Sequence, residues 1–272
     1  MKDLLRIRGE SLNRHMHSQT RKQSGLMRGM SRTHKVMDTA PFTLEITQDA
    51  PAVFHAPSCS GSLDLRLGDC MDVMATFPDG HFDLAIVDPP YGIGMADRAP
   101  CGRLARYGSV KQADNGVPSA EYFEELRRVS KNQIVWGGNY FPLPPSRCFV
   151  IWDKQQPDGV TFADAEFAWA SFDESAKTFR LRPQNADTDR IHPTQKPVRL
   201  YKWLLSKFAK PGQRVLDTHM GSGSIAIAAH YAGVHLTACE IDADYYEAAK
   251  ARIARETRQT DLFIHHNAEL HR

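Results

Sequence analysis

The four consecutive residues Asp88-Pro89-Pro90-Tyr91 place a carboxylate, two prolines and a flat aromatic ring directly after an apolar run. Proline fixes φ and donates no N–H, so this turn offers carbonyl oxygens and the Asp88 carboxylate as hydrogen-bond acceptors. Such acceptors can take both protons of an exocyclic amino group and pull its nitrogen toward a tetrahedral, nucleophilic shape. Tyr91 provides a face on which an extruded base can stack. Taken alone, the tetrapeptide is equally compatible with a proline-rich turn that only has a structural role.

A second pattern follows the apolar residues Val215 and Leu216, where Asp217 ends a strand and a turn with Gly221 and Gly223 opens a helix. Glycine lets the backbone approach a ligand closely, and a helix N-terminus presents N–H groups that have no partner within the helix. After about twenty further residues the next apolar run ends in Glu240, where a carboxylate can accept hydrogen bonds from ribose hydroxyls. The two acids and the glycine turn together favour a cofactor that contains adenosine.

Alternating strand and helix patterns between Pro57 and Thr257 supply the elements that would position these residues. The patterns predict strands at 63–67, 82–87, 133–136, 148–152, 165–170, 214–216 and 235–238, and helices at 71–77, 121–129, 198–209, 222–231 and 243–257. Short apolar strands separated by helices predict an α/β fold, with a mostly parallel sheet and helices on both faces. Ligands bind at the carboxyl ends of such strands, which is where Asp88 would lie.

The composition predicts a soluble protein, because 42% of the residues are hydrophobic, 24% are charged and no apolar stretch could span a membrane. Five scattered cysteines argue against a disulfide framework or a zinc site, so we expect a cytoplasmic protein that holds no metal. The net charge of +2 is unevenly spread, since residues 1–38 hold nine Lys or Arg and three Asp or Glu, which is +6 and leaves −4 for the rest. Residues 1–57 are therefore predicted to form a basic, mobile arm, residues 58–258 the folded domain and residues 259–272 a tail.

The order of the motifs resembles that of the DNA amino-methyltransferases in which the catalytic tetrapeptide precedes the cofactor loop, known as the β group. The likeness runs from about Leu63 to Arg252 and includes Gly68-Asp69-Cys70, the run from Phe82 to Tyr91, and His192-Pro193-Thr194-Gln195-Lys196-Pro197. It implies a Rossmann-like methyltransferase fold that uses S-adenosyl-L-methionine, with double-stranded DNA as the substrate and base flipping as the way to reach the base. The compact layout and the basic arm are similar to phage or prophage members of the group.

The resemblance also implies a role for each motif. Asp88, Pro89, Pro90 and Tyr91 would be catalytic, and the segment Trp136–Tyr140 would lie beside the target-base pocket. His219 stands where the group usually has phenylalanine, so the wall beside the cofactor differs here. The residues that would bind S-adenosyl-L-methionine are Asp69 near its adenine, Glu240 at its ribose, Thr194 and Lys196 at its carboxylate, and Asp217, Gly221 and Gly223 around its methionine end. His219 and Ser224 would also be cofactor-binding.

Two long segments interrupt the strand and helix pattern. Residues 92–119 are predicted to be a mobile loop whose basic side chains hold DNA phosphates, with the arm as a secondary source of contacts. Residues 154–190 are shorter than the usual target-recognition region of the group, so we expect either recognition of a short site or a contribution of residues 92–119 to recognition as well. The predicted phosphate contacts are Arg98, Arg103, Arg106 and Lys111.

The leading interpretation is direct in-line methyl transfer to N6 of adenine. Methylation of cytosine N4 is the nearest alternative, since it presents the same amino geometry, although its tetrapeptide more often begins with serine. A catalytically silent DNA-binding protein on the same scaffold is an alternative from a different class, and the intact Asp88–Tyr91 motif argues against it. The sequence leaves open the recognition site, a paired restriction enzyme and the formation of a homodimer.

Overall fold

The computed structural model describes residues 61–93, 116–159, 163–183, 190–192 and 194–258, and the backbone of residues 52–55. All of these residues lie in the second of the chain's two units, Pro41–Arg272. The predicted tail 259–272, and the predicted arm apart from residues 52–55, lie outside the described residues.

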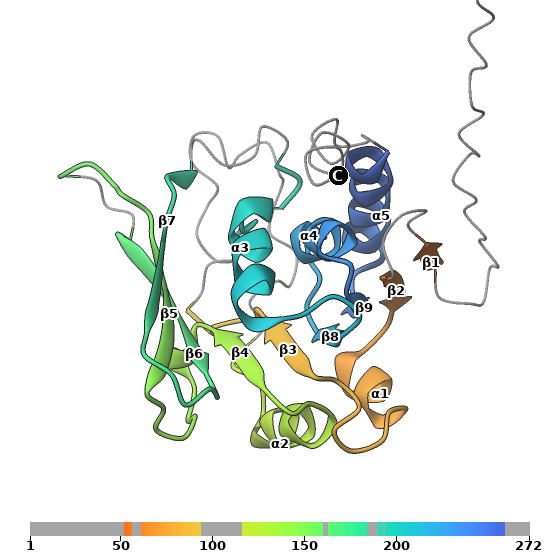
Figure 1. Cartoon of the computed structure of the whole chain (residues 1–272), viewed down its shortest axis with the longest axis horizontal. Coiled ribbons are helices and arrows are strands. Elements are labelled where there is room, and N and C mark those ends of the chain that lie inside the picture. The colour runs from red at the N-terminus through yellow and green to blue at the C-terminus, as the bar shows by residue number, and fades with distance from the viewer. Residues whose placement is uncertain are drawn as a thin grey trace, which may run out of the picture. The chain divides into compact units, whose positions relative to one another are not determined.

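The described residues form one nine-stranded sheet in the order β1-β2-β9-β8-β3-β4-β6-β5-β7 (Figure 1). Five of its eight neighbouring pairs are parallel, namely β2–β9, β9–β8, β8–β3, β3–β4 and β5–β7. The other three pairs are antiparallel. The predicted mostly parallel sheet is therefore confirmed. The strands are β1 (Ala52–His55), β2 (Ser62–Leu67), β3 (Leu84–Val87), β4 (Gln133–Trp136), β5 (Cys148–Asp153), β6 (Ala165–Ala170), β7 (Lys177–Arg180), β8 (Arg214–Asp217) and β9 (His235–Glu240).

Helices cover both faces of the sheet, as the sequence predicts. Figure 1 shows α3, α4 and α5 on one side of the sheet and α1 and α2 on the other. The helices are α1 (Cys70–Ala75), α2 (Ala120–Val129), α3 (Val198–Phe208), α4 (Ser224–Ala232) and α5 (Ala243–Thr257), and a short 3₁₀ turn, η2, spans Gly138–Tyr140. The α/β fold class expected from the alternating patterns is thus the one observed.

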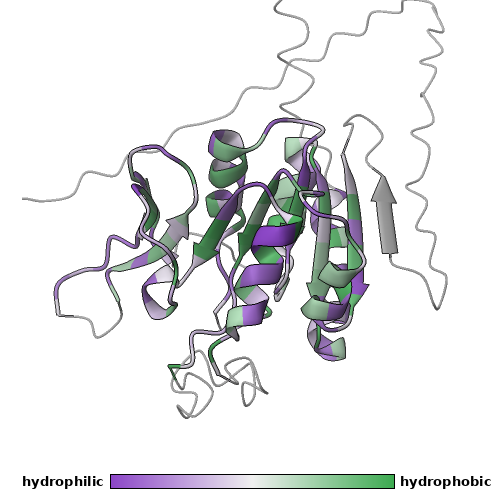
Figure 2. Ribbon diagram, turned by 90° about the horizontal axis from the view of Figure 1, so that it is seen from below, coloured by the Kyte–Doolittle hydropathy of each residue, from purple (hydrophilic) through white to green (hydrophobic). Residues whose placement is uncertain are grey.

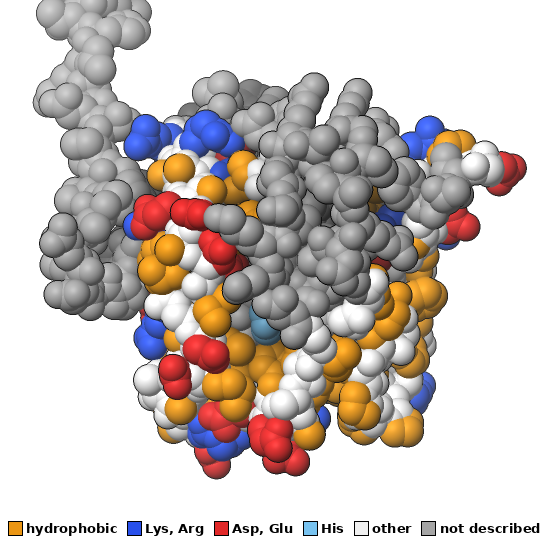
Figure 3. Space-filling model, turned by 180° about the vertical axis from the view of Figure 1, so that it is seen from behind, with side chains coloured by type: hydrophobic (Ala, Val, Ile, Leu, Met, Phe, Trp, Pro, Cys, Tyr) orange, Lys and Arg blue, Asp and Glu red, His pale blue; other side chains and the backbone are white. Residues whose placement is uncertain are grey.

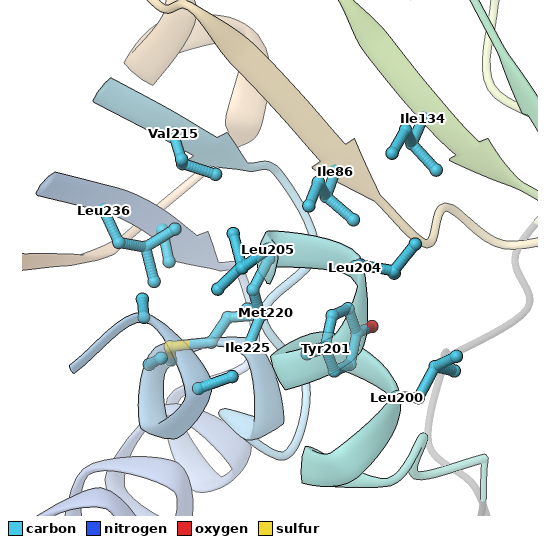
Figure 4. Packing of buried hydrophobic residues seen from close by; sticks show 14 of the residues in the cluster. Ile86, Ile134, Leu200, Tyr201, Leu204, Leu205, Val215, Met220, Ile225 and Leu236 are labelled. Atoms are coloured by element: carbon cyan, nitrogen blue, oxygen red, sulfur yellow. The ribbon is translucent and has the colours of Figure 1, made fainter. Parts of the chain in front are cut away.

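Alternate residues of the central strands pack into two separate cores. Leu84 and Ile86 of β3 belong to the core under α3 and α4, whereas Ala85 and Val87 belong to the core under α1 and α2. This division arises because successive side chains of a strand point to opposite faces. Hydrophobic residues accordingly follow the central strands, while the covering helices keep hydrophilic residues on their outer surface (Figure 2). Figure 4 shows the first core, in which Leu200, Leu204 and Leu205 of α3 lie against Ile86, Ile134, Val215 and Leu236 of four neighbouring strands.

Two strands lie where the sequence predicts none. β1 falls inside the predicted arm and pairs antiparallel with β2, so the sheet begins before residue 57. β7 falls inside the predicted recognition insert and pairs with β5 at the edge of the sheet. Both strands lie at an edge of the sheet and are only four residues long, which is too short for a residue pattern to identify a strand. Part of each predicted accessory segment therefore belongs to the sheet itself.

The strand order brings the two chemical motifs together. β3 ends immediately before Asp88, β8 ends at Asp217, and these two strands are parallel neighbours, with Leu84 opposite Val215 and Ala85 opposite Leu216. β9 pairs with β8 on its other side and ends at Glu240. Because the carboxyl ends of parallel strands meet at one edge of a sheet, the three acids lie along the same edge.

Candidate active site

The Asp88 carboxylate is held at both of its oxygens. The Tyr91 hydroxyl donates a hydrogen bond of 2.6 Å to Oδ1, and the Lys196 ammonium lies 2.5 Å from Oδ2. The Asp88 side chain is 20% exposed, whereas that of Lys196 is only 4% exposed. A carboxylate has about four lone-pair sites, so Asp88 can still accept hydrogen bonds from a ligand while both contacts are made.

A second carboxylate, from Glu166 of β6, completes the surroundings of Lys196. Glu166 Oε2 lies 3.2 Å from Lys196 Nζ, and Glu166 Oε1 lies 2.6 Å from Lys154 Nζ. Burial raises the pKa of Glu166, but the two lysines outweigh it and hold that pKa below its ordinary value, so the carboxylate is ionised. The sequence analysis missed Glu166 and Lys154. The alternation of side chains along a strand could have identified Glu166, because it lies on the same face of β6 as the buried Ala168.

Tyr91 stacks on a second tyrosine from the predicted base-pocket segment. The rings of Tyr91 and Tyr140 lie 5.2 Å apart at an angle of 17°, and Tyr140 is 45% exposed. Gly137 makes room for this arrangement, because a Cβ there would lie 2.3 Å from Tyr91 Cε1 and its φ is +69°. Figure 1 places this turn after β4, next to the end of β3. The structure therefore puts an exposed aromatic surface directly beside Asp88.

Asp217 is buried at the end of β8, with an exposed fraction of 3%. Its Oδ1 accepts a hydrogen bond of 3.0 Å from the His219 backbone N–H. Burial raises the pKa of Asp217 to about 8, and the negative charges of Asp88 and Glu240 add to that rise, although the hydrogen bond from His219 opposes it. The Asp217 carboxyl therefore carries a proton at neutral pH.

In the glycine turn, Gly221 faces open space, whereas Gly223 and Ser224 pack against α5. A Cβ on Gly221, at φ +52°, would have only the His219 carbonyl oxygen nearby, at 4.0 Å. A Cβ on Gly223, at φ +72°, would lie 2.8 Å from Ile253 Cδ1 of α5. Ser224 is buried, and its hydroxyl accepts a hydrogen bond of 2.9 Å from Arg252. Of these three predicted cofactor residues, only Gly221 lines free space, while Gly223 and Ser224 hold α4 against α5.

Two further acidic residues predicted to bind the cofactor, Glu240 and Asp69, accept hydrogen bonds from backbone N–H groups. Glu240 accepts from the Gly221 N–H at 2.8 Å and from the Asp242 N–H at 3.0 Å, which ties the end of β9 to the glycine turn. Asp69 caps α1 by accepting from the Met71 N–H at 2.7 Å. Both carboxylates thus lie at strand ends of the shared edge, where each keeps lone pairs for a ligand.

His219, at the position where the resemblance leads us to expect phenylalanine, has a neutral ring. Its Nδ1 lies 2.8 Å from the Thr218 hydroxyl, and the ring meets that of Tyr122 edge-on at 5.6 Å. Burial lowers its pKa to about 4, so the ring is uncharged at neutral pH. Histidine can therefore serve as a flat, neutral wall in this position.

Thr194 and Lys196, the two residues before α3 that were predicted to bind the cofactor, differ in exposure and in the groups that they contact. Thr194 is exposed, and its hydroxyl lies 3.0 Å from Nδ1 of His192. Lys196, predicted to contact a cofactor carboxylate, contacts Asp88 and Glu166 in the structure. Among the described residues, no group of three or more His, Cys, Asp or Glu side chains could hold a metal ion. No helix within that part of the chain is long and apolar enough to cross a membrane. The predicted DNA contacts Arg98, Arg103, Arg106 and Lys111 lie outside the described residues.

The buried, protonated Asp217 predicts an unusual dependence of stability on pH. In the unfolded chain Asp217 loses its proton at about pH 3.9, whereas in the folded chain it keeps the proton up to about pH 8. Unfolding therefore releases this proton in between, and the free energy of unfolding falls as pH rises. Below about pH 6.5 the lowered pKa of His219 works in the opposite direction, because the unfolded imidazole gains a proton that the folded one excludes.

Between pH 6.5 and 7.5 we expect the titration of Asp217 to lower the free energy of unfolding by about 1 kcal/mol, measured by urea unfolding as the difference in pH dependence between wild type and Asp217→Asn. The isosteric Asp217→Asn variant should lose that fall, because its side chain does not titrate. Equal slopes in the two proteins would show that Asp217 is already ionised in the folded state.

Comparison with known proteins gives a family match and several curated relatives. Residues 148–251 match the family described as DNA methylase, a range that contains the glycine turn and Lys196 but not Asp88. The putative methylase YubD of Escherichia coli (strain K12) is 29% identical over 212 residues, which cover 70% of this chain and 90% of YubD.

Solved structures of similar proteins were found as well. The M1.HpyAVI–SAM complex is 20% identical with a TM-score of 0.47, covering 70% of this chain and 99% of the other. TTHA0409, a putative DNA modification methylase from Thermus thermophilus complexed with S-adenosyl-L-methionine, is 18% identical with a TM-score of 0.46, covering 72% and 95%. By the family match and the long alignment with YubD, the chain is similar to DNA methylases.

Proposed function

We propose that this protein transfers a methyl group from S-adenosyl-L-methionine to an exocyclic amino nitrogen of a base in double-stranded DNA, with N6 of adenine as the leading target. The observation that carries the proposal is the oriented Asp88 carboxylate, which stands beside the Tyr91 ring at the end of β3 and one strand away from the glycine turn after β8. The relationship to DNA methylases supports the same class of reaction.

The glycine turn and its acids suit S-adenosyl-L-methionine. The free space beside Gly221 accepts a ligand that a Cβ would obstruct, and Glu240 offers acceptors to ribose hydroxyls. The buried Asp217 carboxyl offers a neutral donor and acceptor within the same turn. The cofactor, when bound, supplies an electrophilic methyl group.

The chain's own contribution is to position the amine and make it nucleophilic. Asp88 accepts a hydrogen bond from one amino N–H and the Pro89 carbonyl accepts a hydrogen bond from the other, which shifts the nitrogen lone pair out of conjugation with the ring of the base. Tyr91 supports the base through stacking, and its hydrogen bond to Asp88 holds the ring and the acceptor in one geometry. This mode of catalysis relies on placement and fixed electrostatics.

Adenine N6 is preferred over cytosine N4 because the tetrapeptide begins with Asp88 and not serine. Cytosine N4 stays the second candidate, since its amino group would make the same two hydrogen bonds. We also propose that DNA phosphates are held by Arg98, Arg103, Arg106 and Lys111, which lie in the segment predicted from the sequence to be a loop. On the face seen in Figure 3, the described lysines and arginines lie mainly at the margins, with acidic and hydrophobic side chains between them.

Modification-aware sequencing of DNA from cells that express the full chain would test this function. We expect N6-methyladenine at a defined short sequence with the wild type and none with Asp88→Ala. N4-methylcytosine at such a sequence would reassign the base. Unmodified adenine and cytosine in the presence of folded wild-type protein would refute the proposed activity.

A further inference from the structure

We infer that Lys196 is a positioning residue that holds Asp88 and Tyr91 in their working arrangement, is anchored by Glu166, and makes no contact with the cofactor. This inference rests on the proposed function and departs from the role that the sequence resemblance implies for Lys196. It concerns four side chains that come from separate segments of the chain, the end of β3, the turn before α3 and the strand β6.

All three N–H donors of the Lys196 ammonium have an oxygen partner. They are Asp88 Oδ2 at 2.5 Å, the Tyr91 hydroxyl at 3.1 Å and Glu166 Oε2 at 3.2 Å. A lysine ammonium has three donors and no acceptor, so none is left for a cofactor carboxylate. Lys196 could reach the cofactor only by giving up part of a buried ionic cluster, which is strongly unfavourable.

The surroundings of Lys196 also close it off from solvent. Its side chain is only 4% exposed, and its Nζ lies 5.1 Å from the centre of the Trp136 ring and 5.6 Å from that of Tyr91. Burial lowers the pKa of Lys196, but Asp88 and Glu166 outweigh it and raise that pKa above its ordinary value. Lys196 is therefore a fixed positive charge inside the site.

Glu166 and Lys154 balance the charges of this cluster. Two carboxylates, Asp88 and Glu166, face two ammonium groups, Lys196 and Lys154, and the Glu166–Lys154 contact is 2.6 Å long. Glu166 is carried by β6, whose antiparallel pairing with β4 places Ala168 opposite Trp136. The central sheet thus fixes Glu166, which in turn fixes Lys196.

The contacts among Lys196, Asp88 and Tyr91 form a closed triangle. Tyr91 donates to one oxygen of Asp88, Lys196 donates to the other, and Lys196 also donates to the Tyr91 hydroxyl. Displacement of the carboxylate or of the tyrosine hydroxyl would break two of the three contacts. The triangle therefore orders the amine acceptor and the stacking ring as one unit, before any substrate binds.

Lys196→Met in the full chain tests this role. We expect kcat for DNA methylation to fall about 100-fold, while the Kd for S-adenosyl-L-methionine, measured by calorimetry, stays within about twofold of wild type. Glu166→Gln keeps the hydrogen-bonding shape but removes the charge, so it should lower kcat about tenfold in the same pattern. Lys202→Met is the matched control, since Lys202 is an exposed lysine of α3 that lies over Tyr231, and it should leave both values unchanged.

The alternative outcomes separate this role from the proposed function. A Kd for the cofactor that rises in proportion to the loss of kcat would make Lys196 a cofactor ligand and overturn the inference. Normal kcat in Lys196→Met would do the same, and if that variant does not fold, normal kcat in Glu166→Gln decides against the anchor. Wild-type protein that folds, binds the cofactor and methylates no DNA would instead refute the function on which this role depends.

Discussion

Asp88→Ala is expected to lower the rate of methyl transfer by roughly 10²–10³-fold, equivalent to about 2.7–4 kcal/mol of transition-state stabilisation. Asp88 acts on the target amine, and its contacts within the protein run to Tyr91 and Lys196, not to the glycine turn. Cofactor affinity should therefore survive the substitution. Turnover on DNA and calorimetric binding of S-adenosyl-L-methionine measure the two effects separately.

Two further variants test whether the loss of turnover in Asp88→Ala arises from the loss of the Asp88 carboxylate itself. Asp88→Asn preserves the size of the side chain and can still accept from Lys196, so it isolates the loss of the carboxylate from the loss of packing. Asp153→Ala removes an aspartate from the end of another strand, where it pairs with Arg180 at 3.2 Å, and should leave turnover near wild type. Near-normal turnover in both Asp88 variants would remove this residue from the catalytic group.

Gly221→Val is expected to abolish measurable binding of S-adenosyl-L-methionine, at least a roughly 100-fold rise in Kd, because the branched side chain would fill the space that the ligand needs. The new side chain would project into space where only the His219 carbonyl oxygen lies within reach, at 4.0 Å from the Cβ. A branched residue at φ +52° also strains the backbone, at a cost of about 1–2 kcal/mol. The loss of binding must therefore be separated from a loss of stability.

Gly212→Val supplies that separation. Gly212 has φ +80° and, like Gly221, open space around its Cβ position, but it lies in the turn before β8, at the opposite end of that strand from Asp217. Its valine variant should show a similar loss of stability with normal cofactor binding. If Gly221→Val folds and binds the cofactor as tightly as Gly212→Val, the glycine turn is not the cofactor site.

The sequence by itself determined the class of fold and the two motifs on which the proposed function depends. Strands such as 133–136 and 165–170 were predicted with the bounds that the structure shows, because periods of 2 and 3.6 residues are local properties of the chain. β7 was not predicted, since Lys177–Arg180 begins and ends with a charged residue and holds a single large apolar side chain, at the edge of the sheet. Local patterns identify central elements far better than edges.

The tertiary structure alone decided what the side chains of the site contact. Lys196 and Tyr91 are 105 residues apart in the sequence, and their hydrogen bond exists because β3 and the segment before α3 meet at one edge of the sheet. Likewise, Gly221 and Gly223 look alike in the sequence, yet α5 packs against one of them and leaves the other facing open space. The types and spacing of residues along the chain indicate which kind of chemistry the protein can perform. Strand order and helix packing determine which groups come within hydrogen-bonding distance.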